Sequence, residues 1–217
     1  MRKELRINVP SLIIEGIYSG CFEQMNLYHD KCKKTIMYAG GIEKRYGLVN
    51  LIQAFAKIKD HEFALWICGT GEDEFEIKNM SLIDPRIKYF GFMPHFVVLE
   101  MQLKATLLVN PRTPEWSFTK FSFPSKTIEY LASGTPVVMY MNEGIPEEYR
   151  SYCLVPKDYS VCKLAELLED TCKLPKSELE FFGKKARNFI LQTKSIEVQS
   201  NQIFNFIFEN ENKSGAC

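Results

Sequence analysis

The stretch FPSKTIEYLASGTPVV, residues 123–138, decides the fold of this chain. Pro124 lies where the first turn of a helix tolerates proline, and Gly134 lies where a helix commonly ends. A second proline, Pro136, then opens a short β-branched run that is typical of a buried strand. The stretch therefore predicts a short helix that leads directly into a strand, which is the repeating unit of an alternating α/β chain.

Four earlier apolar runs alternate in the same way with amphipathic stretches. One of these stretches, Leu48–Ile58, places apolar residues at helical spacing and so predicts a helix with one buried face. The apolar runs are rich in β-branched and aromatic residues, as strands covered on both faces are. We therefore expect an α/β fold with a doubly wound, Rossmann-like parallel sheet. Its expected strands are Thr35–Ala39, Phe63–Cys68, Ile87–Phe90, Thr106–Asn110 and Pro136–Met139.

Helical periodicity dominates the chain after the last expected strand. The expected helices cover Ser160–Glu169, Lys176–Gln192 and Ser195–Glu209, and residues 210–217 are expected to form a frayed tail. The third helix carries four large apolar residues, more than a free terminal helix needs, so we expect it to pack against a partner. These residues are Ile203, Phe204, Ile207 and Phe208.

The first 34 residues differ from the rest. Ser11–Gly16 is a lone strand-like run, and a polar segment without periodicity follows it. A single strand has no sheet of its own. We interpret residues 1–34 as the last strand and the linker of a preceding domain, and residues 35–209 as one complete domain.

The composition is that of a soluble one-domain protein. The 217 residues are 46% hydrophobic, and 27 basic residues balance 27 acidic ones. This balance gives no electrostatic case for nucleic-acid binding. No apolar run approaches the roughly 18 residues that indicate a membrane-spanning helix. We expect a cytoplasmic protein that reaches the inner face of a membrane only through a partner.

The cysteines and histidines form no recognisable metal or disulfide pattern. The seven cysteines contain no CxxC pair, and the three histidines are not spaced as metal ligands. Both patterns argue against a disulfide framework and a zinc site. We expect reduced thiols, no bound metal and no cofactor.

The loop after the first expected strand is the first candidate ligand site, because ligands of open parallel sheets bind beyond the carboxyl ends of the strands. Gly40 and Gly41 allow close backbone approach there. Lys44 and Arg45 add positive charge just before a helix, which suits a diphosphate. The loop is neither GxGxxG nor a Walker sequence, and a plain glycine turn with solvated charges is an equal alternative.

Lys126 and Glu129 share a face of the short helix because they are three residues apart. In one interpretation Lys126 binds a phosphate and Glu129 accepts hydrogen bonds from ribose hydroxyls. The alternative is an ion pair worth about 0.2–0.5 kcal/mol. Other loop residues are candidates for contact with a base or a sugar, although turn geometry or core packing also explains several of them. They are Gly69, Gly71, Phe92, Met93, Arg112, Pro124, Ser125, Thr127 and Gly144.

Six motifs together resemble the C-terminal domain of family 4 glycosyltransferases. They are Tyr38–Gly41, Gly69–Glu72, Gly91–Phe92, Phe123–Lys126, Glu129–Val138 and Gly144–Glu147. The resemblance implies one half of a GT-B fold, in which two Rossmann-like domains face each other. In that fold the C-terminal domain holds a nucleotide sugar and the N-terminal domain holds the acceptor. The resemblance also implies a retaining, metal-independent reaction, and the Pro-Ser-Lys helix is similar to that of enzymes of surface-polysaccharide assembly.

The sequence departs from this family pattern at two places. Glu129 matches the second glutamate of the family's E-x7-E motif, which binds the ribose, but Phe121 stands where the first glutamate meets the sugar. Its possible substitutes are Lys120, Glu115 and the loop at Glu143. Gly41 and Tyr46 stand where the diphosphate loop of the family often carries arginine and lysine. The remaining cations are Lys44, Arg45 and Lys126.

We therefore expect the donor-binding half of a glycosyltransferase of the hexosyltransferase type. It would transfer a sugar from a UDP- or GDP-sugar to a saccharide or lipid-linked acceptor, and it would need an N-terminal acceptor domain, which a separate subunit could supply. The alternatives are a non-catalytic nucleotide-sugar-binding subunit, an inactive fragment, and a nucleotide-sugar epimerase of the same fold. The missing GxGxxG disfavours a dinucleotide-dependent oxidoreductase. The sequence assigns no catalytic residue.

Overall fold

A single five-stranded sheet forms the centre of the computed structural model, which describes residues 10–27 and 29–214. All strand pairs are parallel, and the order is β3-β2-β1-β4-β5. The strands are β1 Thr35–Ala39, β2 Ala64–Cys68, β3 Ile87–Gly91, β4 Leu107–Asn110 and β5 Val137–Met139. The expected doubly wound parallel sheet is confirmed, and each expected strand lies within one residue of its observed bounds.

The strand order reverses beside β1. The chain adds β2 and β3 on one side of β1, and then crosses back to add β4 and β5 on the other side. Loops that leave neighbouring strands in opposite directions open a crevice between them at the carboxyl end of the sheet. The fold therefore places its natural ligand site beyond β1 and β4.

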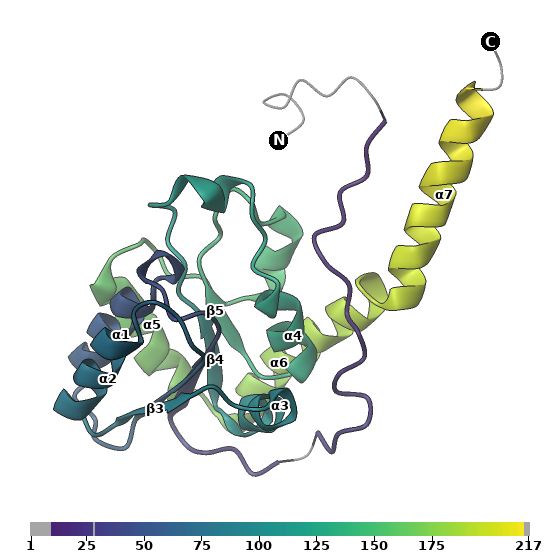
Figure 1. Cartoon of the computed structure of the whole chain (residues 1–217). Helices are drawn as coiled ribbons and strands as arrows, with labels where there is room; N and C mark the ends of the chain where they lie inside the picture. The colour runs from purple at the N-terminus through teal and green to yellow at the C-terminus, as the bar shows by residue number, and fades with distance from the viewer. Residues whose placement is uncertain (1–9, 28, 215–217) are drawn as a thin grey trace.

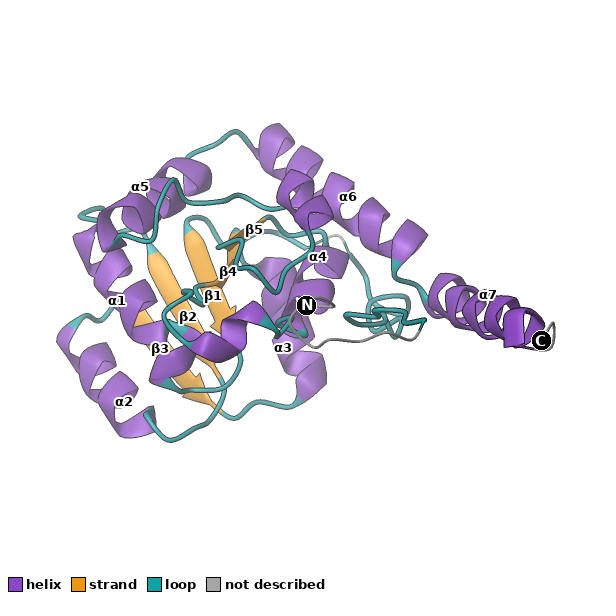
Figure 2. Cartoon of the chain, turned by 90° about the horizontal axis from the view of Figure 1, so that it is seen from above, coloured by secondary structure: helices purple, strands orange, loops and turns teal. Residues whose placement is uncertain are grey.

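Helices cover both faces of the sheet (Figures 1 and 2). Alternate residues of β1 point to opposite faces, so that Ile36 and Tyr38 pack with one set of helices and Met37 and Ala39 with the other. The first set is α1 Leu48–Lys57, α2 Glu74–Ile83 and α5 Val161–Cys172. The second set is α3 His95–Lys104, α4 Lys126–Ser133 and α6 Lys176–Thr193. The apolar stripe predicted for α1 is confirmed, because Leu48, Leu51, Ile52 and Phe55 are buried.

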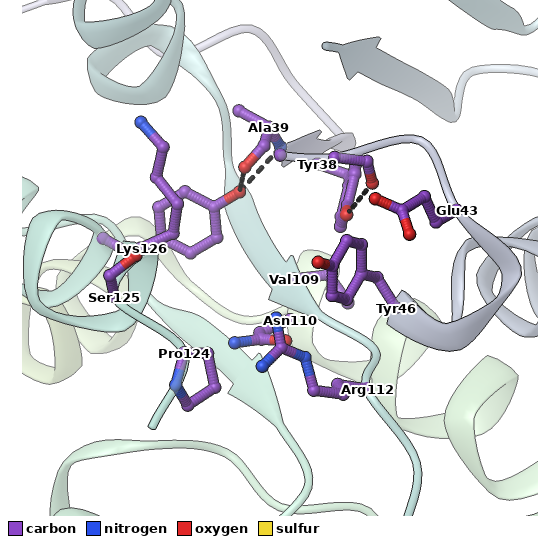
Figure 3. Close-up of a pocket in the computed structure, with 13 residues that line it drawn as sticks. Tyr38, Ala39, Glu43, Tyr46, Val109, Asn110, Arg112, Pro124, Ser125 and Lys126 are labelled. Carbon is purple, nitrogen blue, oxygen red and sulfur yellow. Dashed lines mark hydrogen bonds between the residues drawn. The ribbon is translucent and has the colours of Figure 1, made fainter. Parts of the chain in front are cut away.

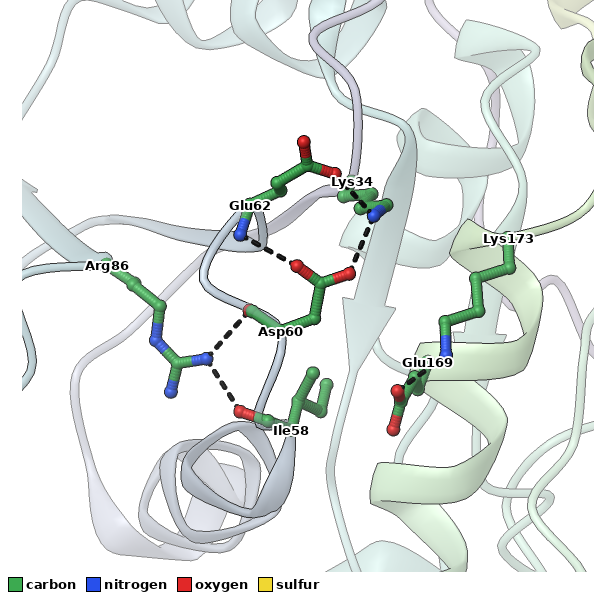
Figure 4. A network of polar contacts seen from close by, with 7 residues as sticks. All are labelled: Lys34, Ile58, Asp60, Glu62, Arg86, Glu169 and Lys173. Atoms are coloured by element: carbon green, nitrogen blue, oxygen red, sulfur yellow. Dashed lines mark hydrogen bonds and ion pairs between the residues drawn. The ribbon is translucent and has the colours of Figure 1, made fainter.

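Charged side chains near the amino ends of the central strands bind one another (Figure 4). Lys34 contacts Asp60 and Glu62, each at 2.6 Å, just before β1 begins. Arg86 donates at 2.6 Å to the carbonyl oxygen of Ile58, at the end of α1. These charged side chains therefore hold neighbouring segments of the fold together. The opposite, carboxyl end of the sheet is the end with a cavity.

The last helix, α7 Ile196–Ser214, extends away from the body of the molecule (Figure 1). The helix continues through residues 210–214, beyond its expected end at Glu209, and residues 215–217 lie outside the described residues, so that fraying of the tail stays a prediction. The four large apolar residues predicted to pack against a partner are exposed. That packing stays a prediction.

The strand expected over Ser11–Gly16 does not form. This segment is irregular, and it pairs with no strand within the described residues. It is held by side chains instead. Glu15 pairs with the buried Lys194 and accepts a 3.0 Å hydrogen bond from the Tyr149 hydroxyl. The backbone of Tyr18 then donates to the carbonyl oxygen of Lys194 at 2.7 Å.

Candidate functional site

A cavity of about 240 Å³ lies at the carboxyl ends of β1 and β4, where the strand order reverses (Figure 3). Three segments line it. The end of β1 and the following loop contribute Tyr38, Ala39, Gly40, Gly41, Glu43 and Tyr46. The end of β4 contributes Val109, Asn110 and Arg112, and the start of α4 contributes Pro124, Ser125, Lys126 and Tyr130. The structure thus brings together six of the predicted site residues: Gly40, Gly41, Arg112, Pro124, Ser125 and Lys126.

Glycines let the loops around this cavity touch backbone to backbone. A Cβ atom on Gly69 would lie 1.8 Å from the carbonyl oxygen of Gly40, and one on Gly71 would lie 2.4 Å from that of Ile42. On the other side, a Cβ on Gly47 would lie 2.0 Å from the carbonyl oxygen of Pro111. Gly69 and Gly71 therefore support the loop that lines the cavity and are not themselves part of the lining.

Two tyrosines fix the end of β1 and leave one amide group free. The buried hydroxyl of Tyr130 accepts from the nitrogen of Ala39 at 2.6 Å and donates to its carbonyl oxygen at 2.9 Å. The hydroxyl of Tyr38 donates to the carbonyl oxygen of Gly41 at 2.7 Å. The neighbouring amides of Gly40 and Ile42 are bonded to the β2 loop, whereas that of Gly41 has no acceptor among the described residues. It is a donor available to an anion.

Glu129 lies beside the cavity in a polar cluster that spans α3 and α4. Its carboxylate accepts hydrogen bonds from Gln102 at 2.6 Å, Lys126 at 2.8 Å and His95 at 2.8 Å. Burial alone would raise the pKa of Glu129, but these three donors outweigh burial and hold the pKa below its ordinary value. The ion pair considered as an alternative is therefore present. Its presence does not test the ribose role of Glu129.

The loop cations predicted to bind a diphosphate are engaged elsewhere. Lys44 pairs with Glu76 of α2 at 2.9 Å, and Arg45 pairs with Glu43 at 2.5 Å. Neither cation lines the cavity. Lys44 and Arg45 belong to the short 3-10 helix η1, Lys44–Tyr46, which ends just before Gly47. Glu76, the partner of Lys44, lies far along the chain, so the sequence alone could not place it nearby.

The remaining predicted residues lie around the cavity at various depths. Phe92 is 77% exposed after β3, and Met93 packs on the core. Thr127 is buried and accepts from Asn110 at 3.2 Å. Gly144 packs against the loop before α4, where a Cβ would lie 2.6 Å from the carbonyl oxygen of Thr119.

Sequence reasoning missed several residues of the site. Glu43 is the carboxylate that lines the cavity, whereas the three proposed substitutes for the missing sugar-contacting glutamate are exposed. Those three are Glu115, Lys120 and Glu143. Tyr38, Tyr46, Asn110 and Tyr130 also line the cavity, and Gln102 is fully buried beneath Glu129. Tyr38, Tyr46 and Tyr130 lie in the loop and motifs that the sequence singles out, and Asn110 ends a predicted strand. Nothing in the sequence indicates that Gln102 belongs to the site.

The described residues contain neither a metal-binding cluster nor a membrane-spanning helix. Within them, no group of three or more histidine, cysteine, aspartate or glutamate side chains is arranged to hold a metal ion. None of the helices in the same residues has both the length and the apolar character to cross a bilayer.

Comparison with known proteins points to one enzyme family. The family model "Glycosyl transferases group 1" matches residues 23–189. A probable glycosyltransferase, WbjE of Pseudomonas aeruginosa, is 25% identical over 163 residues, which cover 71% of this chain and 40% of WbjE. Among solved structures, S. aureus TarM in a complex that includes UDP has a TM-score of 0.67 at 17% identity, covering 82% of this chain and 36% of TarM. Anabaena HepE in complex with UDP has a TM-score of 0.67 at 15% identity, covering 88% and 52%.

The match to the family model extends over well more than half of the chain, so the chain belongs to the family of group 1 glycosyltransferases. Its α/β architecture matches the GT-B glycosyltransferases among the solved structures. The chain spans about half or less of the length of these three relatives.

Proposed function

We propose that this group 1 glycosyltransferase chain binds a nucleoside diphosphate sugar at the cavity beyond β1 and β4, as the donor-binding half of a retaining, metal-independent enzyme of family 4 type. One observation carries the proposal. The cavity at the strand reversal combines the free amide of Gly41 with the ammonium group of Lys126, and the Glu129 carboxylate lies beside it. These are an anion site and a hydroxyl acceptor at adjacent positions.

The Lys126–Glu129 ion pair can couple binding of the phosphate to binding of the ribose. Lys126 and Gln102 donate to the same carboxylate oxygen of Glu129. That oxygen can accept a hydrogen bond from a ligand only after one of these donors leaves. If Lys126 turns to a phosphate oxygen, a ribose hydroxyl can take its place on Glu129. The carboxylate stays charged and hydrogen-bonded throughout, which keeps the exchange from exposing an unpaired buried charge.

The reaction that fits this site is transfer of the sugar to a hydroxyl of a saccharide or lipid-linked acceptor, such as those of surface-polysaccharide assembly. The bond between the anomeric carbon and the diphosphate oxygen breaks, a bond to the acceptor oxygen forms, and the proton of the acceptor hydroxyl passes to the leaving diphosphate. Donors already aimed at the diphosphate stabilise the negative charge of the leaving nucleoside diphosphate. UDP in the HepE and TarM complexes supports a nucleoside diphosphate as the bound group, with UDP and GDP as the candidates.

Calorimetry tests the proposal directly. We expect UDP, GDP or ADP to bind the whole chain in the presence of EDTA. Glu129→Gln should weaken binding about tenfold or more and abolish discrimination between ribose and 2′-deoxyribose, because a charge-assisted hydrogen bond is worth about 1.5–3 kcal/mol. Lys126→Ala should weaken the nucleotide by a similar factor without changing that discrimination.

A matched control exists on another helix. Lys163 and Glu166 form the same i,i+3 ion pair at 2.6 Å on α5, away from the cavity. Glu166→Gln should leave nucleotide affinity within twofold of the wild type. Absence of heat with all three nucleotides would refute the proposed function, and full ribose discrimination by Glu129→Gln would refute the role of Glu129.

A further inference from the structure

The charges around the cavity are paired, with one exception. Three basic side chains near its rim each contact a carboxylate within 3.0 Å. These pairs are Lys44 with Glu76, Arg45 with Glu43, and Lys126 with Glu129. The exception is Arg112, which lines the cavity and has no carboxylate partner among the described residues. The cavity therefore keeps one uncompensated positive charge.

The hydrogen-bond donors of Arg112 are also unused. Its Nε atom is buried and has no hydrogen-bond partner among the described residues. The backbone, in contrast, is fixed, because the carbonyl oxygen of Arg112 accepts from the side chain of Asn142 at 2.8 Å. A buried, unpaired polar group in a native protein is uncommon and calls for a partner that completes it. The partner of a guanidinium group is an anion.

Aromatic rings hold the guanidinium group in place without using its donors. Its central carbon lies 4.7 Å from the ring centre of Tyr46 and 5.6 Å from that of Phe118. Cation–π contacts of this kind orient an arginine while its N–H groups stay free. Burial lowers the pKa of Arg112 below its ordinary value, although an arginine still keeps its proton. The structure thus holds a positive charge, partly shielded from water, that an anion would stabilise.

We propose that Arg112 binds the diphosphate of the donor together with Lys126, so that the loop after β4 supplies the cation that Lys44 and Arg45 do not. This proposal rests on the proposed function. Figure 3 shows the Arg112 side chain along the cavity wall beside Asn110, below the Tyr46 ring. Its planar set of donors suits two oxygens of a phosphate group. Glu43 lies on the same cavity, but its charge is already countered by Arg45.

The first test uses inorganic pyrophosphate as the probe and needs no nucleoside. The NMR cross-peak of the Arg112 Nε–Hε group is identified by its loss in Arg112→Gln. We expect this peak to shift saturably when pyrophosphate is added to the whole chain. A peak that does not move over the titration would overturn the proposal for Arg112, whatever the chain does with nucleotides.

The second test measures nucleoside diphosphate affinity by calorimetry. Arg112→Gln should lose at least tenfold in affinity, and Arg112→Lys, which keeps the charge but not the planar donors, should lose several-fold. Lys184→Gln on the exposed face of α6 removes an equal charge and should change affinity less than twofold. Melting temperatures show whether each variant is folded. If Arg112→Gln does not fold, the affinity of Arg112→Lys decides the test.

The two proposals fail in different ways. If the wild type binds none of the nucleotides yet pyrophosphate shifts the Arg112 peak, the proposed function fails and the anion site stands. If the wild type binds a nucleotide and the affinities of both folded Arg112 variants stay within twofold, the role of Arg112 is refuted and the proposed function stands.

Discussion

At the scale of single residues, Glu129 shows how a carboxylate stays charged in a place with little water. Its side chain is only 14% exposed, so its charge depends on its donors and not on solvent. Buried Gln102 provides a neutral donor, Lys126 provides a charged donor from the cavity lining, and exposed His95 provides the third. The Glu129 carboxylate is therefore already deprotonated and can accept a hydrogen bond from a ligand.

This arrangement predicts how stability depends on pH. The pKa of Glu129 in the folded chain lies below its ordinary value of 4.5, so its contribution is complete above that value and is lost as the pH falls through the folded pKa. Glu129→Gln should therefore be less stable than the wild type at pH 6, by about the 1.5–3 kcal/mol that a hydrogen bond to a charged group is worth, and the gap should shrink in acid.

Urea unfolding at several pH values measures this gap. The other titratable groups around Glu129 are His95 of α3, Lys126 and Tyr130 of α4, and Cys21 of the N-terminal segment. Of the side chains around Glu129, only a carboxyl group titrates in the range from pH 5 to 3. The shrinking difference in stability between the two proteins therefore measures the protonation of Glu129 in the folded and unfolded states. A gap that stays constant in this range would show that Glu129 is not stabilised by its donors.

At the scale of elements, the loops depend on backbone contacts that only glycine permits. Gly69 has a φ of 139° and Gly91 a φ of 67°, so both lie in the region that side chains disfavour. A Cβ on Gly69 would meet the carbonyl oxygen of Gly40, whereas one on Gly91 would meet no atom within 4 Å. Gly91→Ala should cost about 1–2 kcal/mol from backbone conformation. Gly69→Ala should cost clearly more and should displace the loop that lines the cavity.

Thermal unfolding and calorimetry of the two variants separate the effects. The prediction is a larger loss of melting temperature for Gly69→Ala, together with nucleotide affinity at least tenfold weaker than that of the wild type. Equal losses of stability in the two variants would show that backbone conformation, and not the contact between the loops, is what Gly69 provides.

The elements also show which part of the structure the sequence could predict. The strands were predictable because each is buried on both faces, and such runs differ from their neighbours in composition. The strand expected at Ser11–Gly16 was not, because a strand needs a partner that no local pattern can supply. The same limit applies to the site. Lys44 meets Glu76, and Arg112 meets Tyr46, only after distant segments have folded together.

At the scale of the whole molecule, we expect the chain to form one wall of a site. The cavity opens at the carboxyl ends of the strands of a single sheet. Helix α7 projects from the body of the molecule and has an exposed apolar face. On that face the rings of Phe204 and Phe208 lie 4.2 Å apart, and Ile203 and Ile207 are exposed beside them. An exposed apolar set of this kind is typical of a docking surface. We expect it to pack against an acceptor domain.

The last prediction is that the 217-residue chain alone binds the donor but does not transfer its sugar at an enzyme-like rate. Transfer needs the acceptor hydroxyl held next to the anomeric carbon, and such positioning can supply about 7–11 kcal/mol of the barrier reduction. The chain spans only 36–52% of its relatives TarM and HepE, and one sheet cannot enclose both substrates. A donor-turnover assay with free and lipid-linked saccharide acceptors measures this, first on the chain alone and then with an acceptor domain added. Activity should appear only with the added domain, and Phe204→Asp on α7 should reduce it while nucleotide affinity stays unchanged. Robust transfer by the chain alone would show that this wall is sufficient.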